Sequence, residues 1–192
     1  MLAGRIVRLE PLAPEHGPGL RAAAAHDEIW TWIRSPPPAS SDAEWEAFFG
    51  GALEASARGE EAAFATLDVT TGEPLGSTRF LALRPEHRGL EVGWTWLTPA
   101  AWRTGANTEA KLLQLTHAFE TLGCVRVELK TNARNRRSRV AMARIGATHE
   151  GIARRHMVTP GIGDGLRDSA WFSITDADWP AVRERLRTRL GR

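Results

Sequence analysis

The feature that most constrains the fold is a strand–loop–helix–strand unit in the middle of the chain. Residues 90–97 alternate in polarity as a β-strand does, and residues 125–131 have the composition of a second strand. Between them, apolar side chains recur at helical spacing after Thr108, and Gly123 stands where a helix ends in a left-handed residue. The unit predicts a layered arrangement in which helices pack on a sheet.

The remainder of the chain supplies the other layers. Alternating polarity and turn residues predict five more strands, at residues 6–9, 62–68, 75–83, 149–158 and 166–174. Helices are predicted at residues 14–25, 28–33, 42–53 and 135–145, and from a cap at Asp176 to residue 190. The expected fold is α/β (α+β), with a mixed sheet of about seven strands and helices on both faces.

Composition narrows the class of protein. The chain has 192 residues, 42% of them hydrophobic, and its only linker-like stretch is the short segment 35–41, so residues 1–192 are expected to form a single domain. Cys124 is the only cysteine, which excludes an internal disulfide and fits a reducing compartment. No apolar run reaches membrane-spanning length, and the first ten residues lack a signal-peptide pattern. A cytoplasmic location and no membrane partner are expected.

The loop between the central strand and helix favours anion binding. It reads WRTGANT over residues 102–108, and a glycine before a helix N-terminus presents free backbone N–H groups to an anion. Arg103 adds a positive charge, and Gly105 is expected to allow a phosphate close to the backbone. Neither a P-loop nor a dinucleotide-binding glycine motif is present. An ordinary strand-to-helix turn is the alternative explanation of this loop.

Several short motifs, in the same order, resemble those of GNAT-superfamily N-acetyltransferases of the RimJ/RimL (ribosomal-protein N-terminal acetyltransferase) branch. They are GRIVRLEPL (4–12), EVGWTWL (91–97), WRTGANTEA (102–110), HAFETLG (117–123), NRRS (135–138) and IGATHEG (145–151). The resemblance covers nearly the whole chain. It departs from the superfamily at Asn107, where glycine or alanine is usual, and at Trp102, where many members outside the branch have glutamine or arginine.

The resemblance implies a sheet that is splayed at its centre, with acetyl-CoA as co-substrate. The pantetheine arm would lie between strands 90–97 and 125–131, bonded to the backbone near Leu97 and Thr98, with Asn135 touching it. The pyrophosphate would bind to the backbone N–H groups of Arg103, Thr104, Gly105, Ala106, Asn107 and Thr108. The arginines at 134, 136, 137 and 139 would contact the CoA phosphates; a solvated helix end is the simpler alternative.

Acetyl transfer to an amine requires a stabilised oxyanion, a proton for the thiolate and a neutral amine. A backbone N–H of strand 90–97 is the expected oxyanion donor. The chain contains no tyrosine, the residue with which many family members protonate the thiolate, so Ser138 is predicted to help instead. Glu91 is the first candidate base, ahead of His156 and Glu150. Glu91 as a mere ion-pair partner and Ser138 as a helix-surface hydroxyl are the structural alternatives.

The acceptor is expected to bind to the N-terminal third. Trp30, Trp32 and Arg34 lie before three consecutive prolines, and a stiff aromatic wall with one cation suits an amine substrate with an acidic group. Burial of the tryptophans in the core is the alternative, and the turn-rich segment 159–165 is the alternative acceptor site.

The predicted acceptor is a small-molecule primary amine or a peptide N-terminus. A catalytically silent CoA-binding or small-molecule sensing module is the competing function. A net charge of only +2 disfavours a nucleic-acid partner, and no histidine or cysteine cluster has metal-ligand spacing. Whether two copies form a homodimer is left open.

Overall fold

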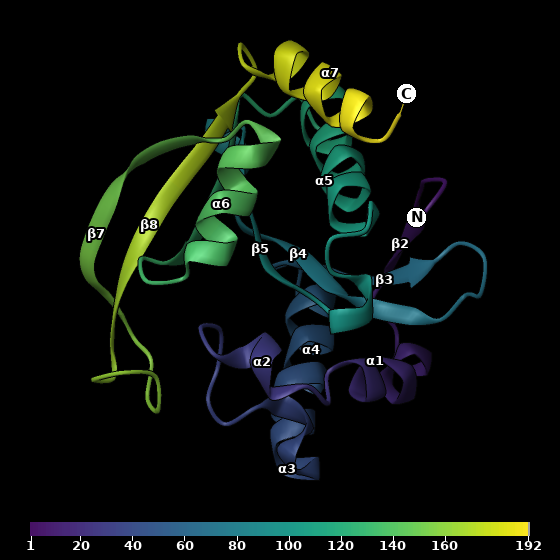
Figure 1. Cartoon of the computed structure of the whole chain (residues 1–192), viewed down its shortest axis with the longest axis vertical. Helices are drawn as coiled ribbons and strands as arrows, with labels where there is room; N and C mark the ends of the chain where they lie inside the picture. Colours follow the sequence, from purple (N-terminus) through teal and green to yellow (C-terminus); the bar gives the residue numbers. More distant parts are fainter. Residues whose placement is uncertain (192) are drawn as a thin grey trace.

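One mixed sheet of eight strands forms the centre of the computed structural model, which describes residues 1–191 (Figure 1). The strand order is β1-β2-β3-β4-β5-β6-β8-β7, and only β5 and β6 pair in parallel. Their bounds are β1 Leu2–Ala3, β2 Val7–Pro11, β3 Ala62–Asp68, β4 Pro74–Arg84, β5 Gly89–Leu97, β6 Arg126–Asn132, β7 Thr148–Val158 and β8 Leu166–Thr175. The predicted fold class is confirmed. The additional strand is β1, which at two residues is too short to show an alternation.

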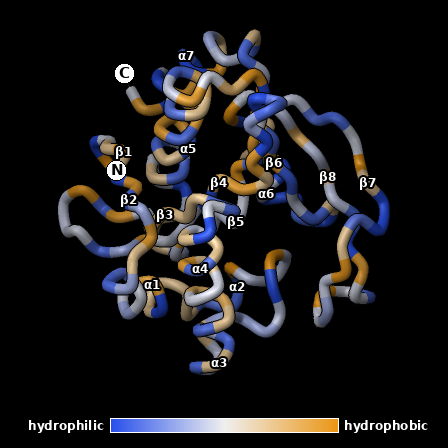
Figure 2. Tube along the Cα trace, turned by 180° about the vertical axis from the view of Figure 1, so that it is seen from behind, coloured by the Kyte–Doolittle hydropathy of each residue, from blue (hydrophilic) through white to orange (hydrophobic). Residues whose placement is uncertain are grey.

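Helices cover the two faces of this sheet (Figure 1). Buried side chains of the N-terminal helices form one cluster with β3 and Trp96; the helices are α1 Gly17–Ala23, α2 Asp27–Trp30, α3 Asp42–Trp45 and α4 Gly51–Ala57. A second cluster joins the sheet to the later helices, which are α5 Ala106–Thr116, α6 Arg136–Ile145 and α7 Trp179–Arg189. Along α5 and α7 the trace alternates between hydrophobic and hydrophilic residues (Figure 2), as expected for helices with one buried face.

Helix ends show where the sequence patterns hold and where they fail. Ser41 Oγ accepts the Glu44 N–H at 3.1 Å and so caps α3, immediately before residue 42, where the sequence predicts a helix to begin. Gly123 has a φ of +66°, as predicted, after a π-helical turn that extends α5. The predicted start of α7 is wrong: its N-cap residue is Asp178 rather than Asp176. Likewise, α5 begins at Ala106, two residues before the predicted start.

The centre of the sheet is open between β5 and β6. The two strands pair only from Gly89–Arg126 to Glu91–Glu128, and beyond that point β6 pairs with β8 alone. The splayed sheet expected from the resemblance is therefore present. No helix within residues 1–191 is long and apolar enough to cross a membrane.

Candidate active site

Glu91 lies at the point where β5 and β6 separate. It is the last residue of β5 that pairs with β6, and only 3% of its surface is exposed. Its Oε2 accepts a hydrogen bond from Lys130 Nζ at 2.5 Å, and that ammonium lies 5.1 Å from the Trp171 ring centre. The ion-pair partner of Glu91 is thus a lysine of the neighbouring strand β6. A buried carboxylate and a cation stand together at the opening of the sheet.

The backbone of β5 is distorted immediately after this point. Its register with β4 shifts between Gly93 and Trp96, and Trp94 has a φ of +46°. A bulge of this kind turns backbone groups out of the regular ladder. It provides a location for the oxyanion-binding N–H predicted on this strand. The Trp94 ring packs beside Phe48 at 5.8 Å and beside the Arg79 guanidinium at 5.2 Å.

The loop before α5 is held by its own side chains. Thr104 Oγ1 donates to the Ala101 carbonyl at 2.8 Å and accepts the Ala106 N–H at 3.1 Å. The next N–H groups, those of Asn107 and Thr108, belong to the first helical turn and have no intrahelical acceptor. They remain candidates for anion binding, together with the dipole of an 11-residue helix.

The structure gives Gly105 a packing role that the sequence did not reveal. A Cβ built at this position would lie 2.4 Å from Ile6 Cδ1, and the φ of Gly105 is an ordinary −72°. The residue is therefore glycine at least partly because the N-terminal segment packs on it. Close approach of a phosphate stays a prediction, and a valine at 105 would disturb this packing before it tested phosphate binding.

The backbone at the end of β5 already has partners within the chain. The Thr98 N–H donates to the Leu75 carbonyl at 2.7 Å, and Trp102 Nε1 donates to the Leu97 carbonyl at 2.8 Å. The expected pantetheine contacts at Leu97 and Thr98 would have to use the second lone pair of a carbonyl or a neighbouring group. The indole of Trp102, one of the departures from the superfamily pattern, thus fixes the turn into α5.

The spacing of Asn135 and Ser138 has a structural cause. Asn135 Oδ1 accepts the Ser138 N–H at 3.0 Å, which caps the N-terminus of α6. Asn135 is buried and Ser138 half-buried. Their predicted contacts with the pantetheine arm and the thiol stay predictions.

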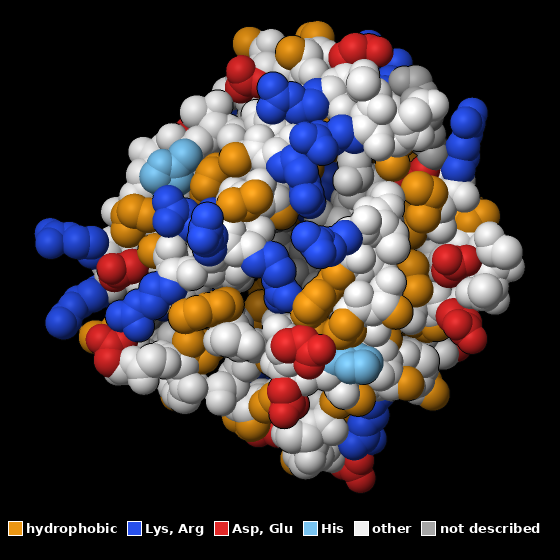
Figure 3. Space-filling model, in the orientation of Figure 1, with side chains coloured by type: hydrophobic (Ala, Val, Ile, Leu, Met, Phe, Trp, Pro, Cys, Tyr) orange, Lys and Arg blue, Asp and Glu red, His pale blue; other side chains and the backbone are white. Residues whose placement is uncertain are grey.

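Cations gather at the N-terminal end of α6. Arg137 places its guanidinium 4.0 Å from the Trp102 ring centre, so this side chain links α6 to the loop before α5. Figure 3 shows lysine and arginine side chains around a hollow in the middle of the face, in the region between α6 and α5 of Figure 1. A polyanion at the first turn of α5 would meet the N-terminal end of the α5 dipole on one side and the Arg137 guanidinium of α6 on the other.

Two of the predicted acceptor-binding residues are engaged inside the protein. Trp30 is 1% exposed, donates from Nε1 to the Ala24 carbonyl at 2.8 Å and packs on Trp96, so it belongs to the core and is not a wall open to substrate. Arg34 pairs with the Glu44 carboxylate, so its guanidinium is not free to hold an acidic substrate group. Trp32 is half-buried, and its predicted acceptor contact is not tested.

The two alternative acceptor regions meet in space. A Cβ at Gly161, in the β7–β8 turn, would lie 2.7 Å from Ser35 Oγ in the proline loop. Ile162 of the same turn is buried. The segment 159–165 and the proline loop therefore lie next to each other at this point, and both stay predictions for the acceptor site.

The surroundings of the other two candidate bases, Glu150 and His156, lower the pKa of each. Glu150 pairs with Arg126 and accepts from Ser173 Oγ at 2.6 Å; these contacts, the arginine first, lower its pKa to about 2, which makes it a poor base. Burial, followed by the charges of Lys130 and Arg167, lowers the pKa of His156. His156 is thus neutral at physiological pH, with Nδ1 3.0 Å from Ser169 Oγ.

Sequence reasoning did not single out two cations that the structure places partly or fully inside the protein, Lys111 and Arg167. Lys111, on α5, is 4% exposed and donates to Thr95, Gln114 and Thr78. Arg167, on β8, is half-buried. The available signal was that Lys111 and Lys130 are the only lysines among 25 basic residues.

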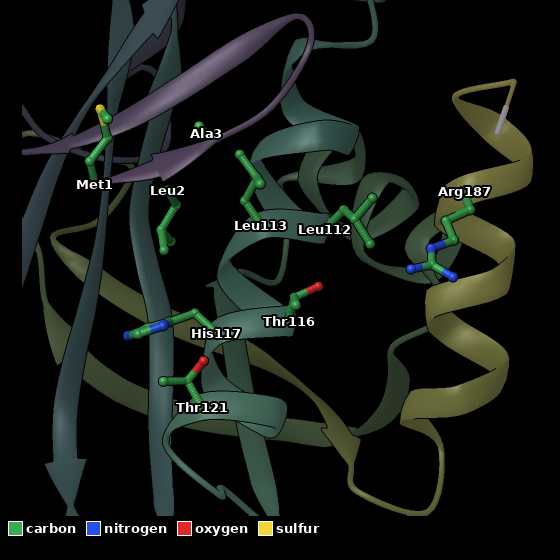
Figure 4. A pocket seen from close by; sticks show the side chains of 9 residues that line it. All are labelled: Met1, Leu2, Ala3, Leu112, Leu113, Thr116, His117, Thr121 and Arg187. Atoms are coloured by element: carbon green, nitrogen blue, oxygen red, sulfur yellow. The ribbon is translucent and has the colours of Figure 1, made fainter.

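A cavity lies away from the candidate site. It has a volume of about 450 Å³ and opens between β1 and the C-terminal half of α5, with His117 and Arg187 at its edges (Figure 4). None of the candidate site residues lines it. Within residues 1–191, no group of three or more histidine, cysteine or acidic side chains is placed to hold a metal ion.

Comparisons with protein families and with known proteins both match acetyltransferases. A family model described as "Acetyltransferase (GNAT) domain" matches residues 7–148. An uncharacterised N-acetyltransferase of Bacillus subtilis (strain 168), YoaA, is 30% identical over 91 residues, which are 47% of this chain and 51% of that protein. The match thus spans about half the length of that relative.

Solved structures share the fold over nearly the whole chain. A GCN5-related N-acetyltransferase from Brucella melitensis has a TM-score of 0.89 and 34% identity, covering 97% of this chain and 83% of its own. Mycobacterium smegmatis RimJ, solved with CoA-disulfide, has a TM-score of 0.77 and 21% identity, covering 97% and 90%. At that identity, the likeness to RimJ concerns the fold alone.

Proposed function

The chain belongs to the GNAT acetyltransferase family and is an acetyltransferase, and on this premise we propose that it transfers the acetyl group of acetyl-CoA to a primary amine in a ternary complex. The observation that carries the proposal is the Glu91–Lys130 pair at the opening of the sheet, next to the bulge at Trp94. The amine nitrogen attacks the thioester carbonyl, a β5 backbone N–H stabilises the oxyanion, and CoA leaves as the thiol.

Glu91 takes the amine proton in this proposal, directly or through water, and Ser138 assists departure of the thiolate. We propose that residues 1–192 form one domain for this reaction. The first turn of α5 and the arginines of α6 fit a CoA pyrophosphate, since both present donors to an anion at the same place.

Peptide N-termini are the acceptors that we favour, as in the RimJ/RimL branch suggested by the motif order. A screen for released thiol tests this, with acetyl-CoA and a panel of peptides, amino acids and polyamines. Turnover with peptides and not with polyamines is expected. Binding of acetyl-CoA without release of thiol from any acceptor would favour the silent CoA-binding module, for which the absence of tyrosine is the supporting observation.

Arg137→Ala is expected to weaken acetyl-CoA binding by about tenfold, the value of one charge-assisted contact. The guanidinium lies over Trp102, beside the predicted pyrophosphate site. Calorimetry at two salt concentrations measures the loss, which should shrink at high salt. Arg144→Ala, an exposed arginine at the other end of α6, is the control and should retain wild-type affinity. Equal affinities in the two variants would place the phosphates elsewhere.

Ser138→Ala is expected to lower kcat by about 10²-fold, the lower range of general-acid assistance, with acetyl-CoA affinity unchanged. The Ser138 N–H bond that caps α6 is a backbone contact and survives the substitution. Single-turnover acetyl transfer measures the chemical step. A wild-type rate would show that the hydroxyl has no chemical role.

A further inference from the structure

A second group of charges surrounds the Glu91–Lys130 pair. Arg167, Ser169 and Trp171 alternate along β8 and therefore project from one face of the sheet, while Ala170 and Phe172 between and beyond them are buried in the α5–α7 cluster. Lys130 contacts the Trp171 ring and Glu91, so these side chains share the face that the C-terminal helices leave uncovered.

His156 joins this face from β7. Its ring contacts Trp171 at 5.4 Å in a T-shaped arrangement and Ser169 Oγ at 3.0 Å. The carboxylate of Glu91 and the cations of Lys130 and Arg167 all act on the charge of His156. The five side chains therefore form one electrostatic group; its members are Glu91, Lys130, His156, Arg167 and Trp171.

The charges of this group do not balance. Among residues 1–191, Glu91 is the only carboxylate that acts on His156 or Arg167, and it is already hydrogen bonded to Lys130. Arg167 Nε is buried and has no hydrogen-bond partner among residues 1–191. Burial lowers the pKa of Arg167 even though Glu91 acts in the opposite direction. A half-buried guanidinium whose Nε–H has no acceptor is costly unless a ligand accepts that hydrogen bond.

We propose that Arg167 binds a carboxylate of the acceptor, so that the enzyme selects amines that carry a carboxylate a few bonds away. This inference rests on the proposed function, because it concerns the acceptor side of the same site. A guanidinium matches a carboxylate with two parallel N–H···O bonds, and partial burial strengthens them. The carboxylate would also neutralise the excess charge of Lys130 and Arg167, while Glu91 remains available to the amine.

The structure assigns to Arg167 the role that the sequence suggested for Arg34. Arg34 is ion-paired with Glu44, whereas Arg167 forms no ion pair with a carboxylate of residues 1–191, although the Nε of each arginine is buried without a partner. Two kinds of acceptor carry such a carboxylate. A free amino acid has its α-carboxylate, and a peptide can have an acidic side chain near its N-terminus. Paired acceptors that differ only in that charge distinguish them.

The test compares kcat/KM for an amino acid against its amide, and for a peptide that begins Ser-Glu against one that begins Ser-Gln. The acidic member of at least one pair should be preferred by roughly tenfold to hundredfold, the range of one hydrogen bond to a charged group. Arg167→Gln should abolish the preference through KM, and Arg167→Lys should retain part of it. Arg154→Gln, which removes an exposed charge from the neighbouring strand β7, should preserve it.

Equal use of acidic and neutral acceptors by the wild-type enzyme would overturn the inference while leaving the proposed function intact. A preference that survives Arg167→Gln would overturn it too. Calorimetric titration of the same pairs onto the CoA complex requires no turnover, so the inference is tested even if no acceptor is acetylated. Binding of the acidic members without thiol release would support Arg167 and count against the proposed function alone.

Discussion

Glu91→Gln is expected to lower kcat by about 10²–10⁴-fold, the usual contribution of a general base, while the Kd for acetyl-CoA stays within about twofold. The carboxylate is 3% exposed and lies where β5 and β6 separate, on the same strand as the bulge at Trp94. Glutamine keeps the size of the side chain and an oxygen for Lys130 to donate to, and it removes the basic site. Single-turnover transfer and an acetyl-CoA titration on the same variant separate chemistry from binding.

The chain offers a matched control. Glu128 pairs in register with Glu91 across β5 and β6, is 8% exposed, and bonds to Arg84 at 2.8 Å and Arg126 at 2.9 Å. Glu128→Gln therefore removes a comparable buried carboxylate from an ion pair and should retain most of kcat. Similar losses of kcat in both variants would show that Glu91 is only an ion-pair partner. Wild-type kcat in Glu91→Gln together with a loss in His156→Gln would assign the base to His156.

The fold was predictable where the sequence pattern is long and periodic. The central unit from β5 to β6 and the glycine end at Gly123 are confirmed, because helical and strand periods differ clearly over such lengths. The errors lie at short elements and at ends. A two-residue strand such as β1 has no period, and Asp176 and Asp178 are equally good cap residues by type.

The site was predictable only in outline. Motif order identified β5, the loop before α5 and the start of α6, but ion-pair partners depend on which strands become neighbours. Glu91 and Lys130 are 39 residues apart in sequence, and nothing local indicates that they meet. Because ion-pair partners depend on the fold, the sequence also led to the expectation of a free Arg34 and gave no reason to single out Arg167.

Burial of a cation is another feature that sequence periodicity does not reveal. Lys111 lies on the inner face of α5, where its ammonium donates to Thr95 Oγ1 at 2.8 Å, Gln114 Oε1 at 2.8 Å and Thr78 Oγ1 at 3.2 Å. All three acceptors are neutral. Burial lowers the pKa of Lys111 from its usual 10.5 to about 7. The protonated form is thus less stable inside the protein than in the unfolded chain.

The pKa of Lys111 determines how the contribution of this residue to the free energy of unfolding depends on pH. Between pH 7 and pH 10.5 the unfolded chain holds a proton on Lys111 that the folded protein has lost, so the contribution of Lys111 to the free energy of unfolding rises with pH. Below pH 7 both states are protonated and the cost is constant. At about 1.4 kcal/mol per pKa unit, that cost at neutral or lower pH is of the order of 5 kcal/mol.

Lys111→Met is therefore expected to raise the free energy of unfolding, by about 2 kcal/mol at pH 7 once the lost hydrogen bonds of about 1 kcal/mol each are deducted. The oxygens that accept from Lys111 keep a hydrogen bond without it, because Thr95 and Thr78 bond to each other at 2.7 Å and Thr78 donates to Gln114 Oε1 at 3.1 Å. The gain should fall as the pH approaches 10, since the wild-type cost disappears there.

Urea unfolding of wild type and Lys111→Met at pH 7 and pH 9.5 measures this difference, and other titrating groups cancel between the two proteins. Lys130→Met, at the only other lysine, is the control with the opposite sign: it leaves the Glu91 carboxylate buried without its partner and should cost about 3 kcal/mol. If Lys111→Met is less stable than wild type at both pH values, the hydrogen bonds of the ammonium outweigh its burial. A gain that does not change with pH would mean that Lys111 keeps its proton throughout this range, so that apolar packing of the methionine, rather than relief of a buried charge, produces the stabilisation.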